Sequence, residues 1–499
     1  MPLSSTEEQA FHQKLQFRFL IVLGILCTLG MGLYIYTGLI ATLALPLLGI
    51  AAFWLFTDIK SFYWLFILSI PFSVQIYLAG GSLSTSLPDE PIMWVFVGVT
   101  GLLWAHNKNL LPKWYVNHPL FVIILLQFIW LVVSVIYSTN HFYSVKFLLA
   151  KIWFLNAFII FPAWVISKPK DLKRMVALFV IPVVLHSFVV IVWHYYEDFG
   201  FQASNKVVKP FYYNHVDYST ILSCVFPILI GAYLYKKDQK LRRWVLLGLI
   251  LFMLPAIYFA SARAAILGVV FALVVWAGLK YKFTKWLMPI GFVAITFIMS
   301  LMIHNENYLS LRPDKHENAT QETFIDAVTG MFSGKDMSSM ERIYRWIASV
   351  RMAPEKPIVG VGPNNFYEHY KNYTVTSFET WVSDNPERST THNYFLFLLV
   401  EQGFPAMILY AVFLIVFFAR SQKLYYLTKR RDYQIYVMVI TMVMAANFVN
   451  NFFSELIETH KVGAVFYLSI ASLIIVDRWI KLEIEGEKVK DDENLLEVE

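Results

Sequence analysis

The side chains best suited to chemistry in this sequence are one histidine and a few arginines at the borders of long apolar runs. Arg342 and Arg345 are three residues apart, so a helix would place both guanidinium groups on one face. Arg263 lies in a short stretch between two apolar runs, and His392 stands where a long polar segment ends. Guanidinium groups bind phosphate oxygens bidentately, and an imidazole removes protons near neutral pH. These residue types suit a diphosphate substrate and a proton transfer.

Other polar residues lie within or beside apolar runs. Lys151 lies inside one such run, and His215 and Asp217 stand at the start of another. An ionisable residue in a membrane-length apolar run is costly unless it is paired or functional. We therefore treat Lys151 as a further candidate for binding the diphosphate. His215, Asp217 and Asn393 are accessory candidates.

Each candidate also has a purely structural explanation. Lys151 could pair with a buried acid or a carbonyl, and Arg263 could anchor a lipid phosphate. Arg342 could pair with Glu341 or Asp336 across a surface. His392 could be no more than a hydrogen-bonded cap at a helix start. These alternatives stay open on the sequence alone. The functional interpretation rests on the convergence of several cations and one imidazole on one predicted side of a membrane.

The sequence does not support a metal or nucleotide site. It contains no His-Glu-x-x-His motif and no Cys/His cluster, and Cys27 and Cys224 both lie in apolar runs. The acids near the candidate residues lack metal-ligand spacing. Residues 360–365 are glycine-rich, but no Lys-Ser/Thr pair follows, so we expect a turn and not a nucleotide loop. We predict no metal and no other cofactor.

The elements that must position these residues are transmembrane helices. Of the 499 residues, 58% are hydrophobic and 17% aromatic, whereas only 15% are charged. Soluble domains carry about 25% charged residues, so the composition excludes a water-soluble enzyme, a disordered chain and a disulfide-rich secreted domain. The apolar runs are long and unbroken, which favours helices. We predict an all-α polytopic membrane protein with about 12–14 transmembrane helices.

The candidate spans lie near residues 19–36, 38–57, 62–79, 91–106, 119–138, 146–166, 172–194, 218–235, 244–260, 262–279, 285–303, 393–419, 433–453 and 461–479. Four regions follow from them: N-terminal transmembrane helices at 1–303, an external loop subdomain at 304–391, C-terminal transmembrane helices at 392–480, and an acidic cytoplasmic tail at 481–499.

Lysine and arginine are concentrated in alternate connections between these spans. The connections near 168–174, 236–243, 280–285 and 420–431 hold many, and those between them hold few. The positive-inside rule places the basic connections in the cytoplasm and His392 on the opposite side. Residues 304–391 then lie outside, and we expect them to form a small folded subdomain with a helix around Met340–Met352.

Three motifs follow one another on this predicted outer side. Ser261-Ala262-Arg263-Ala264 comes first, followed by Arg342, Arg345-Trp346 and Gly360-Val361-Gly362-Pro363. Last comes His392-Asn393, nine residues, and Gly403-Phe404-Pro405-Ala406. Over about residues 210–420 the chain thus resembles the O-antigen ligase family of bacterial membrane glycosyltransferases, which includes related O-antigen polymerases and O-linked protein oligosaccharyltransferases. Ala264 and Ala406 stand where the family usually has glycine.

The resemblance implies a GT-C-like fold and the transfer of a glycan from undecaprenyl diphosphate to an acceptor hydroxyl, with inversion and without a metal. The acceptor would be the lipid A-core glycolipid of lipopolysaccharide biosynthesis or another hydroxyl acceptor. The enzyme would lie in the bacterial cytoplasmic (inner) membrane, among membrane lipids, with its active site facing the periplasm. The resemblance implies that His392 is the catalytic residue, and that Arg263 and one or both of Arg342 and Arg345 contact the diphosphate. Lys151 is added from its charge alone, and no nucleic-acid partner is expected.

Other functions stay open at this point. Polymerase, ligase and protein oligosaccharyltransferase differ in their acceptor, which the sequence does not separate. A lipid-linked oligosaccharide flippase or other transporter would also be polytopic, although such proteins usually show internal repeats and broken helices. A scaffolding protein of the cell envelope would not need the clustered outer cations.

Overall fold

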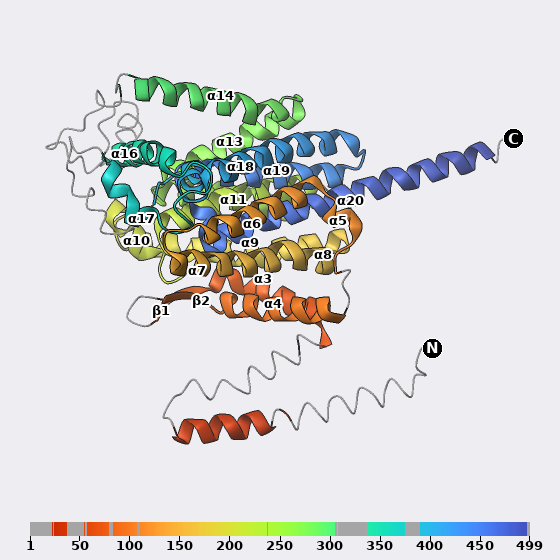
Figure 1. Ribbon diagram of the computed structural model, residues 1–499. Helices are drawn as coiled ribbons and strands as arrows, with labels where there is room; N and C mark the ends of the chain where they lie inside the picture. The colour runs from red at the N-terminus through yellow and green to blue at the C-terminus, as the bar shows by residue number, and fades with distance from the viewer. Residues whose placement is uncertain are drawn as a thin grey trace.

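The computed structural model describes residues 22, 24–36, 54, 57–78, 83–106, 110–236, 238–304, 307, 337–374 and 390–496. Most of these residues form a bundle of long helices that lie side by side (Figure 1). Among them, ten candidate spans are long and apolar enough to cross a membrane. The predicted class, a polytopic helical membrane protein, is therefore confirmed.

The long helices are α6 (Pro119–Ile136), α7 (His141–Leu155), α9 (Pro169–Tyr195), α11 (His215–Tyr235), α12 (Lys240–Phe259), α13 (Arg263–Lys280), α14 (Thr284–Ile303), α18 (Tyr394–Leu427), α19 (Arg431–Phe452) and α20 (His460–Leu496). A π-helical turn, η3 (Asn156–Ile160), joins α7 to α8 (Phe161–Val165), and the three form one candidate span. The shorter elements are α3 (Ile59–Phe72), α4 (Asp89–His106), α5 (Lys113–Val116), η4 (Phe201–Ala203), α10 (Ser204–Val207), α16 (Met337–Met352), η6 (Ala353–Glu355), α17 (Phe366–His369), η7 (Tyr370–Tyr373) and η8 (Leu456–Glu458).

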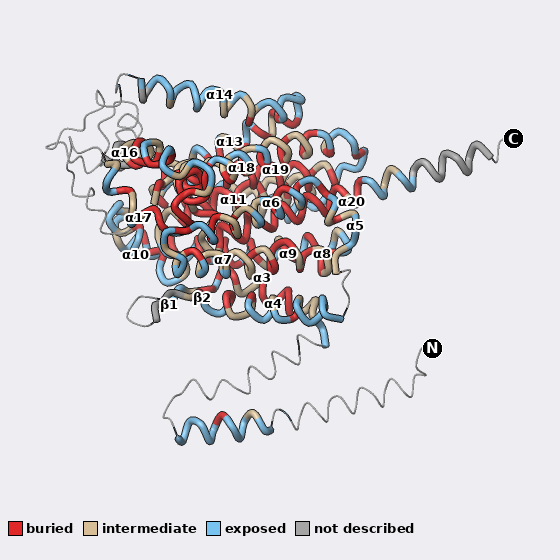
Figure 2. The backbone as a smooth tube through the Cα atoms, in the orientation of Figure 1, coloured by how far each residue is buried: buried red, intermediate tan, exposed pale blue. Residues whose placement is uncertain are grey.

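Helices α19 and α20 form the interior of the bundle, whereas α14 lies at its edge (Figure 2). The buried share of the apolar window is 83% in α19 and 94% in α20, but only 11% in α14. Helix α13 approaches α19 closely at Gly268, where a Cβ would lie 2.8 Å from Asn450 Nδ2. Small residues allow such close helix packing within membranes. The helices that carry the site therefore pack tightly against one another at the centre of the bundle.

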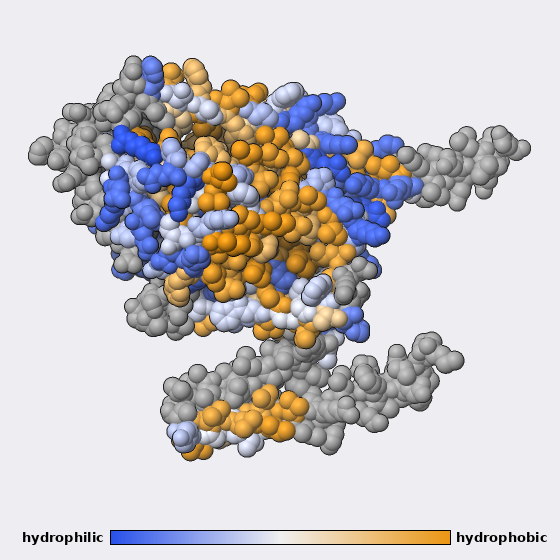
Figure 3. Space-filling model, in the orientation of Figure 1, coloured by the Kyte–Doolittle hydropathy of each residue, from blue (hydrophilic) through white to orange (hydrophobic). Residues whose placement is uncertain are grey.

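The surface in Figure 3 has an apolar band between two hydrophilic ends. We call one the α16 end, because α16, α17 and the start of α18 lie there, and the other the basic end (Figure 1). At the basic end, Arg431 donates to Leu234 O, and Gln422 donates to Lys282 O. The basic connections thus gather at one end, as the charge pattern predicts. Which side of a membrane that end faces stays a prediction.

One predicted span is wrong in part. The apolar run 62–79 does not continue as helix, because α3 ends at Phe72 and Ser73 has extended backbone angles. Residues of β1 (Val74–Leu78) pair antiparallel with β2 (Leu83–Leu87), with Val74 opposite Leu87 and Leu78 opposite Leu83. Aromatic and β-branched residues in alternation with polar ones favour a strand. The fold is thus helical with one small hairpin.

The predicted number of spans, about 12–14, exceeds the ten found in the described residues. The predicted span 19–36 overlaps a shorter apolar helix, Gly24–Tyr36, and all of 38–57 except residues 54 and 57 lies outside the described residues. Helix α3 has only 14 residues, and α4 begins with Asp89 and Glu90, so neither is among the ten.

The described part of residues 304–391 packs on the bundle. Helix α16 confirms the helix predicted around Met340–Met352. Met352, the last residue of α16, forms a small apolar cluster with Val361, Phe366, Tyr370 and Val400 of α18. This cluster fixes the segment 352–370 against the helix that follows His392.

Candidate active site

Helix α16 is the element that positions the paired arginines. Trp346 packs its ring against Phe452 at the end of α19, with ring centroids 5.8 Å apart. The residue directly before Trp346, the buried Arg345, donates from Nη1 to Thr390 O at 3.2 Å. The arginine side of α16 is therefore tied to the segment that leads into His392.

His392 comes two residues before the start of α18 and has a left-handed backbone, with φ of 52°. It is not the helix cap, because Asn393 fills that role: its Oδ1 accepts from Phe395 N at 2.9 Å and from Leu396 N at 3.1 Å. Asn393 Nδ2 also donates to Phe452 O at 3.0 Å. The structural alternative for His392, a simple cap, is therefore wrong, and its imidazole is available for another role.

The surroundings of His392 keep it neutral. Burial, reinforced by the positive charges of Arg342 and Arg345, lowers the pKa of His392 to about 3. Arg342 also interacts electrostatically with His215 at the start of α11. The structure thus brings together His392, both arginines of α16 and the accessory candidate His215. An unprotonated imidazole beside two cations can accept a proton close to a bound anion.

Glu455 belongs to the same group, although the sequence analysis did not single it out. Burial raises its pKa above the usual value, and Thr390, Arg345 and Arg342 act in the opposite direction. Glu455 lies in the short connection between α19 and α20, where no motif or periodicity marks it. It reaches the site because Asn393 and Trp346 both hold the end of α19, at Phe452, against the start of α18 and against α16.

Two of the motifs act together to shape this region. Helix α18 is broken at Gly403, where φ is 80° and ψ is 176°. A Cβ at Gly403 would lie 2.0 Å from Ile358 O, and one at Gly360 would lie 2.3 Å from the carbonyl carbon of Glu401. Glycine is needed at these positions, because the loop and the break in α18 touch backbone to backbone. As predicted, the backbone forms a turn within residues 360–365.

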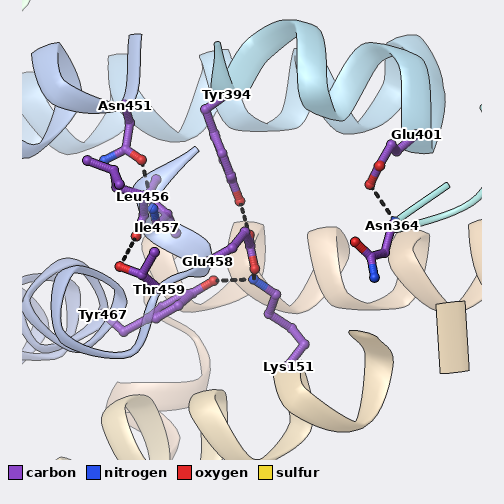
Figure 4. A network of polar contacts seen from close by, with 10 residues as sticks. All are labelled: Lys151, Asn364, Tyr394, Glu401, Asn451, Leu456, Ile457, Glu458, Thr459 and Tyr467. Carbon is purple, nitrogen blue, oxygen red and sulfur yellow. Dashed lines mark hydrogen bonds and ion pairs between the residues drawn. The ribbon is translucent and has the colours of Figure 1, made fainter. Parts of the chain in front are cut away.

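Glu401 fastens this turn to α18. Its fully buried carboxylate accepts hydrogen bonds from Asn364 N at 2.6 Å and from Phe366 N at 3.1 Å (Figure 4). The backbone adds hydrogen bonds from Val361 N to Val400 O and from Gly362 N to Glu401 O, both 3.0 Å long. The glycine motifs therefore serve to hold the external segment against the helix that begins after His392.

The remaining predicted residues lie at the α16 end in other settings. Arg263 is the first residue of α13, directly after a tight turn in which Ser261 has φ of 57°. Ala264, the alanine in place of the usual glycine, is the second residue of α13, a helical position that suits alanine. Asp217 is buried near the start of α11 and interacts electrostatically with Lys461. The roles of Arg263 and Asp217 stay predictions.

Lys151 lies in a separate polar network (Figure 4). Its Nζ donates to Glu458 Oε1 at 2.8 Å and to Oε2 at 2.7 Å, and to the hydroxyl of Tyr467 at 3.2 Å. The hydroxyl of Tyr394 donates to Glu458 Oε1 at 2.9 Å. Lys151 is therefore paired with an acid, one of the structural explanations that the sequence left open.

A small pocket of about 40 Å³ lies beside this network. It lies among α6, α7, α18 and α20, and its lining includes Gln127, Gln402 and Ala406. Ala406, where the family usually has glycine, is buried just after the break in α18 and lines this pocket. Among the described residues, no group of three or more His, Cys, Asp or Glu side chains could hold a metal ion.

The fold and site define a polytopic membrane protein with a neutral imidazole beside two arginines at one end of its bundle. Residues 248–411 match a family model described as O-antigen ligase. The match contains Arg263, Arg342, Arg345 and His392, and it confirms the resemblance drawn from the motifs. Over these residues the chain is similar to O-antigen ligases, which indicates a membrane enzyme of the ligase or polymerase type. No curated protein sequence matches the chain significantly.

Proposed function

We propose that the chain moves a glycan from undecaprenyl diphosphate to an acceptor hydroxyl at the α16 end of the bundle. The observation that carries this proposal is the position of His392 beside Arg342 and Arg345, inside the matched O-antigen ligase region. By the positive-inside rule the α16 end faces the periplasm of a bacterial inner membrane. The fold would then be of the GT-C type.

The arginines would hold the leaving group. As the bond between the sugar carbon and the diphosphate oxygen breaks, positive charge develops on the sugar and negative charge on the diphosphate. Guanidinium groups from Arg342, Arg345 and Arg263 would neutralise that charge with fixed, bidentate hydrogen bonds. Such a site needs no metal for this step.

His392 would act as the general base. The acceptor oxygen forms the new bond to the sugar carbon, and its proton passes to the imidazole. In the free enzyme His392 has a pKa of about 3, so it is unprotonated but weakly basic. A bound diphosphate would offset the charges of Arg342 and Arg345 and thereby raise this pKa. His392 would therefore become a stronger base once the donor is bound. Attack by the acceptor oxygen on the side opposite the diphosphate would invert the configuration of the sugar carbon.

The acceptor decides between the related reactions. We propose the ligase reaction, with a lipid A-core glycolipid as acceptor. The polymerase reaction, with a second lipid-linked repeat, and transfer to protein Ser/Thr use the same donor chemistry. All three need the same cations and base.

The test is reconstitution in vesicles with an undecaprenyl diphosphate-linked glycan and each acceptor in turn. We expect carrier-linked glycan to disappear only with core glycolipid, and the glycan to appear on that lipid. Transfer only to a second repeat or to protein would replace the ligase reaction by one of its relatives. Movement of intact donor across the bilayer without transfer would identify a flippase and contradict the proposal.

A further inference from the structure

Four structural elements meet at the ion pair of Lys151 and Glu458 (Figure 4). Lys151 belongs to α7 and Glu458 to η8, and their side chains are only 12% and 20% exposed. Tyr394 of α18 donates to the carboxylate, and Tyr467 of α20 lies 3.2 Å from the ammonium. The pair therefore links helices that are distant in sequence.

Two of these contacts reach the segments that form the candidate site. Tyr394 is the first residue of α18 and follows His392 by two positions. Glu458 follows Glu455 by three positions in the same short connection. On its other side, that connection is anchored where Ile457 N donates to Asn451 Oδ1 at 2.7 Å. A shift of Glu458 would consequently disturb both His392 and Glu455.

The donors of Lys151 are already used. An ammonium group has three N–H donors, and Nζ has three acceptors: both oxygens of Glu458 and the hydroxyl of Tyr467. A diphosphate could bind Lys151 only by displacing Glu458. That displacement would leave a largely buried carboxylate without its partner, which is strongly unfavourable.

We infer that Lys151, Glu458 and Tyr394 form a positioning clamp that holds His392 and the α19–α20 connection against the arginines of α16. Lys151 acts through Glu458 and does not contact the diphosphate. This inference rests on the proposed function, and it replaces the diphosphate-binding role that the sequence suggested for Lys151. The clamp keeps the reacting groups in their positions. Misplacement of reacting groups by about 1 Å can lower the rate about 100-fold.

The test compares Lys151→Met, Glu458→Gln, the double variant and Tyr394→Phe in vesicles. The matched control is Tyr410→Phe, since the Tyr410 hydroxyl is buried near Tyr394 and has no hydrogen-bond partner among the described residues. For each we measure kcat, donor KM, and binding of undecaprenyl diphosphate. Hydrogen exchange in a peptide covering 390–400 reports on the start of α18 independently of activity.

The clamp predicts that Lys151→Met and Glu458→Gln each lower kcat by about 100-fold and leave undecaprenyl diphosphate affinity within about threefold. The double variant should be no worse than the worse single variant, because both changes remove one interaction. It carries no unpaired buried charge, so it keeps the comparison valid if Lys151→Met fails to fold. Tyr394→Phe should accelerate exchange in 390–400, and Tyr410→Phe should not.

Two results would overturn the clamp. One is a tenfold or greater loss of undecaprenyl diphosphate binding in Lys151→Met but not in Glu458→Gln, which would identify Lys151 as a ligand of the diphosphate. The other is wild-type kcat and wild-type exchange in Glu458→Gln and Tyr394→Phe. In both cases the wild-type protein still transfers glycan. If the proposed function itself were wrong, the wild-type protein would transfer no glycan, and this result separates the two kinds of failure.

Discussion

The break in α18 gives a prediction whose size follows directly from the structure. In a Gly403→Ala variant the new Cβ would lie 2.0 Å from Ile358 O and 2.8 Å from Pro357 O. The backbone there, with φ of 80° and ψ of 176°, is essentially restricted to glycine, and another residue pays about 1–3 kcal/mol. The clash also threatens the hydrogen bond from Phe404 N to Pro357 O, worth about 0.5–1.5 kcal/mol. We expect Gly403→Ala to lower the free energy of unfolding by about 1.5–4.5 kcal/mol in total.

The assay is thermal unfolding of purified protein in detergent, combined with glycan transfer in vesicles. The control is Gly248→Ala in α12, where a Cβ meets nothing within 4 Å. Alanine in that helix should be neutral or slightly stabilising, by about 0.5–1 kcal/mol. Gly403→Ala should unfold at a clearly lower temperature and transfer less glycan. Equal unfolding temperatures for the two variants would refute the argument that backbone contact at the break requires glycine.

Three further predictions concern the site and its orientation. Arg342→Ala and Arg345→Ala should each weaken donor binding or turnover by about 1–3 kcal/mol. Lysine at either position should restore activity only in part, because it lacks the two-pronged hydrogen bonding of the guanidinium group. Wild-type rates in both alanine variants would show that the diphosphate site lies elsewhere. Because the pKa of His392 is about 3 in the free enzyme, kcat/KM should show no inflection from His392 near pH 6.5. By the proposed mechanism, bound donor raises the pKa of His392, so kcat should fall as the pH drops through that raised pKa. An inflection of kcat/KM near pH 6.5 that vanishes in His392→Asn would contradict the low pKa of His392 in the free enzyme. In a background without native cysteines, Asn372→Cys should react with an impermeant thiol reagent in intact spheroplasts and Gln239→Cys should not, and the reverse pattern would overturn the orientation.

Residue patterns predict the broad architecture because membrane burial is governed by local composition. Long apolar runs predict the spans, and the alternating basic connections predict which loops share an end of the bundle. The same local reasoning fails at 74–78, where an apolar run continues in composition but changes from helix to strand after Ser73. A short apolar run alone does not separate helix from strand.

The candidate site is predictable only where a motif or an isolated charge marks a residue. His392 and Arg345 stand out in this way, and Asn393 could have been recognised as the cap because Asn is a strong N-cap residue. Glu455 and Glu458 carry no such mark. They matter because α7, α18 and α20 converge on one short connection, and that convergence is a property of the packed bundle.

His392→Asn tests the central claim most directly. Asparagine tolerates the left-handed backbone at this position, with its φ of 52°, so the change removes the imidazole with little strain. The account predicts that His392→Asn folds normally and binds undecaprenyl diphosphate like the wild type. Its initial rate of glycan transfer in vesicles should fall by about 100- to 10,000-fold, the usual contribution of a general base. A transfer rate close to that of the wild type would contradict the assignment of His392 as the base.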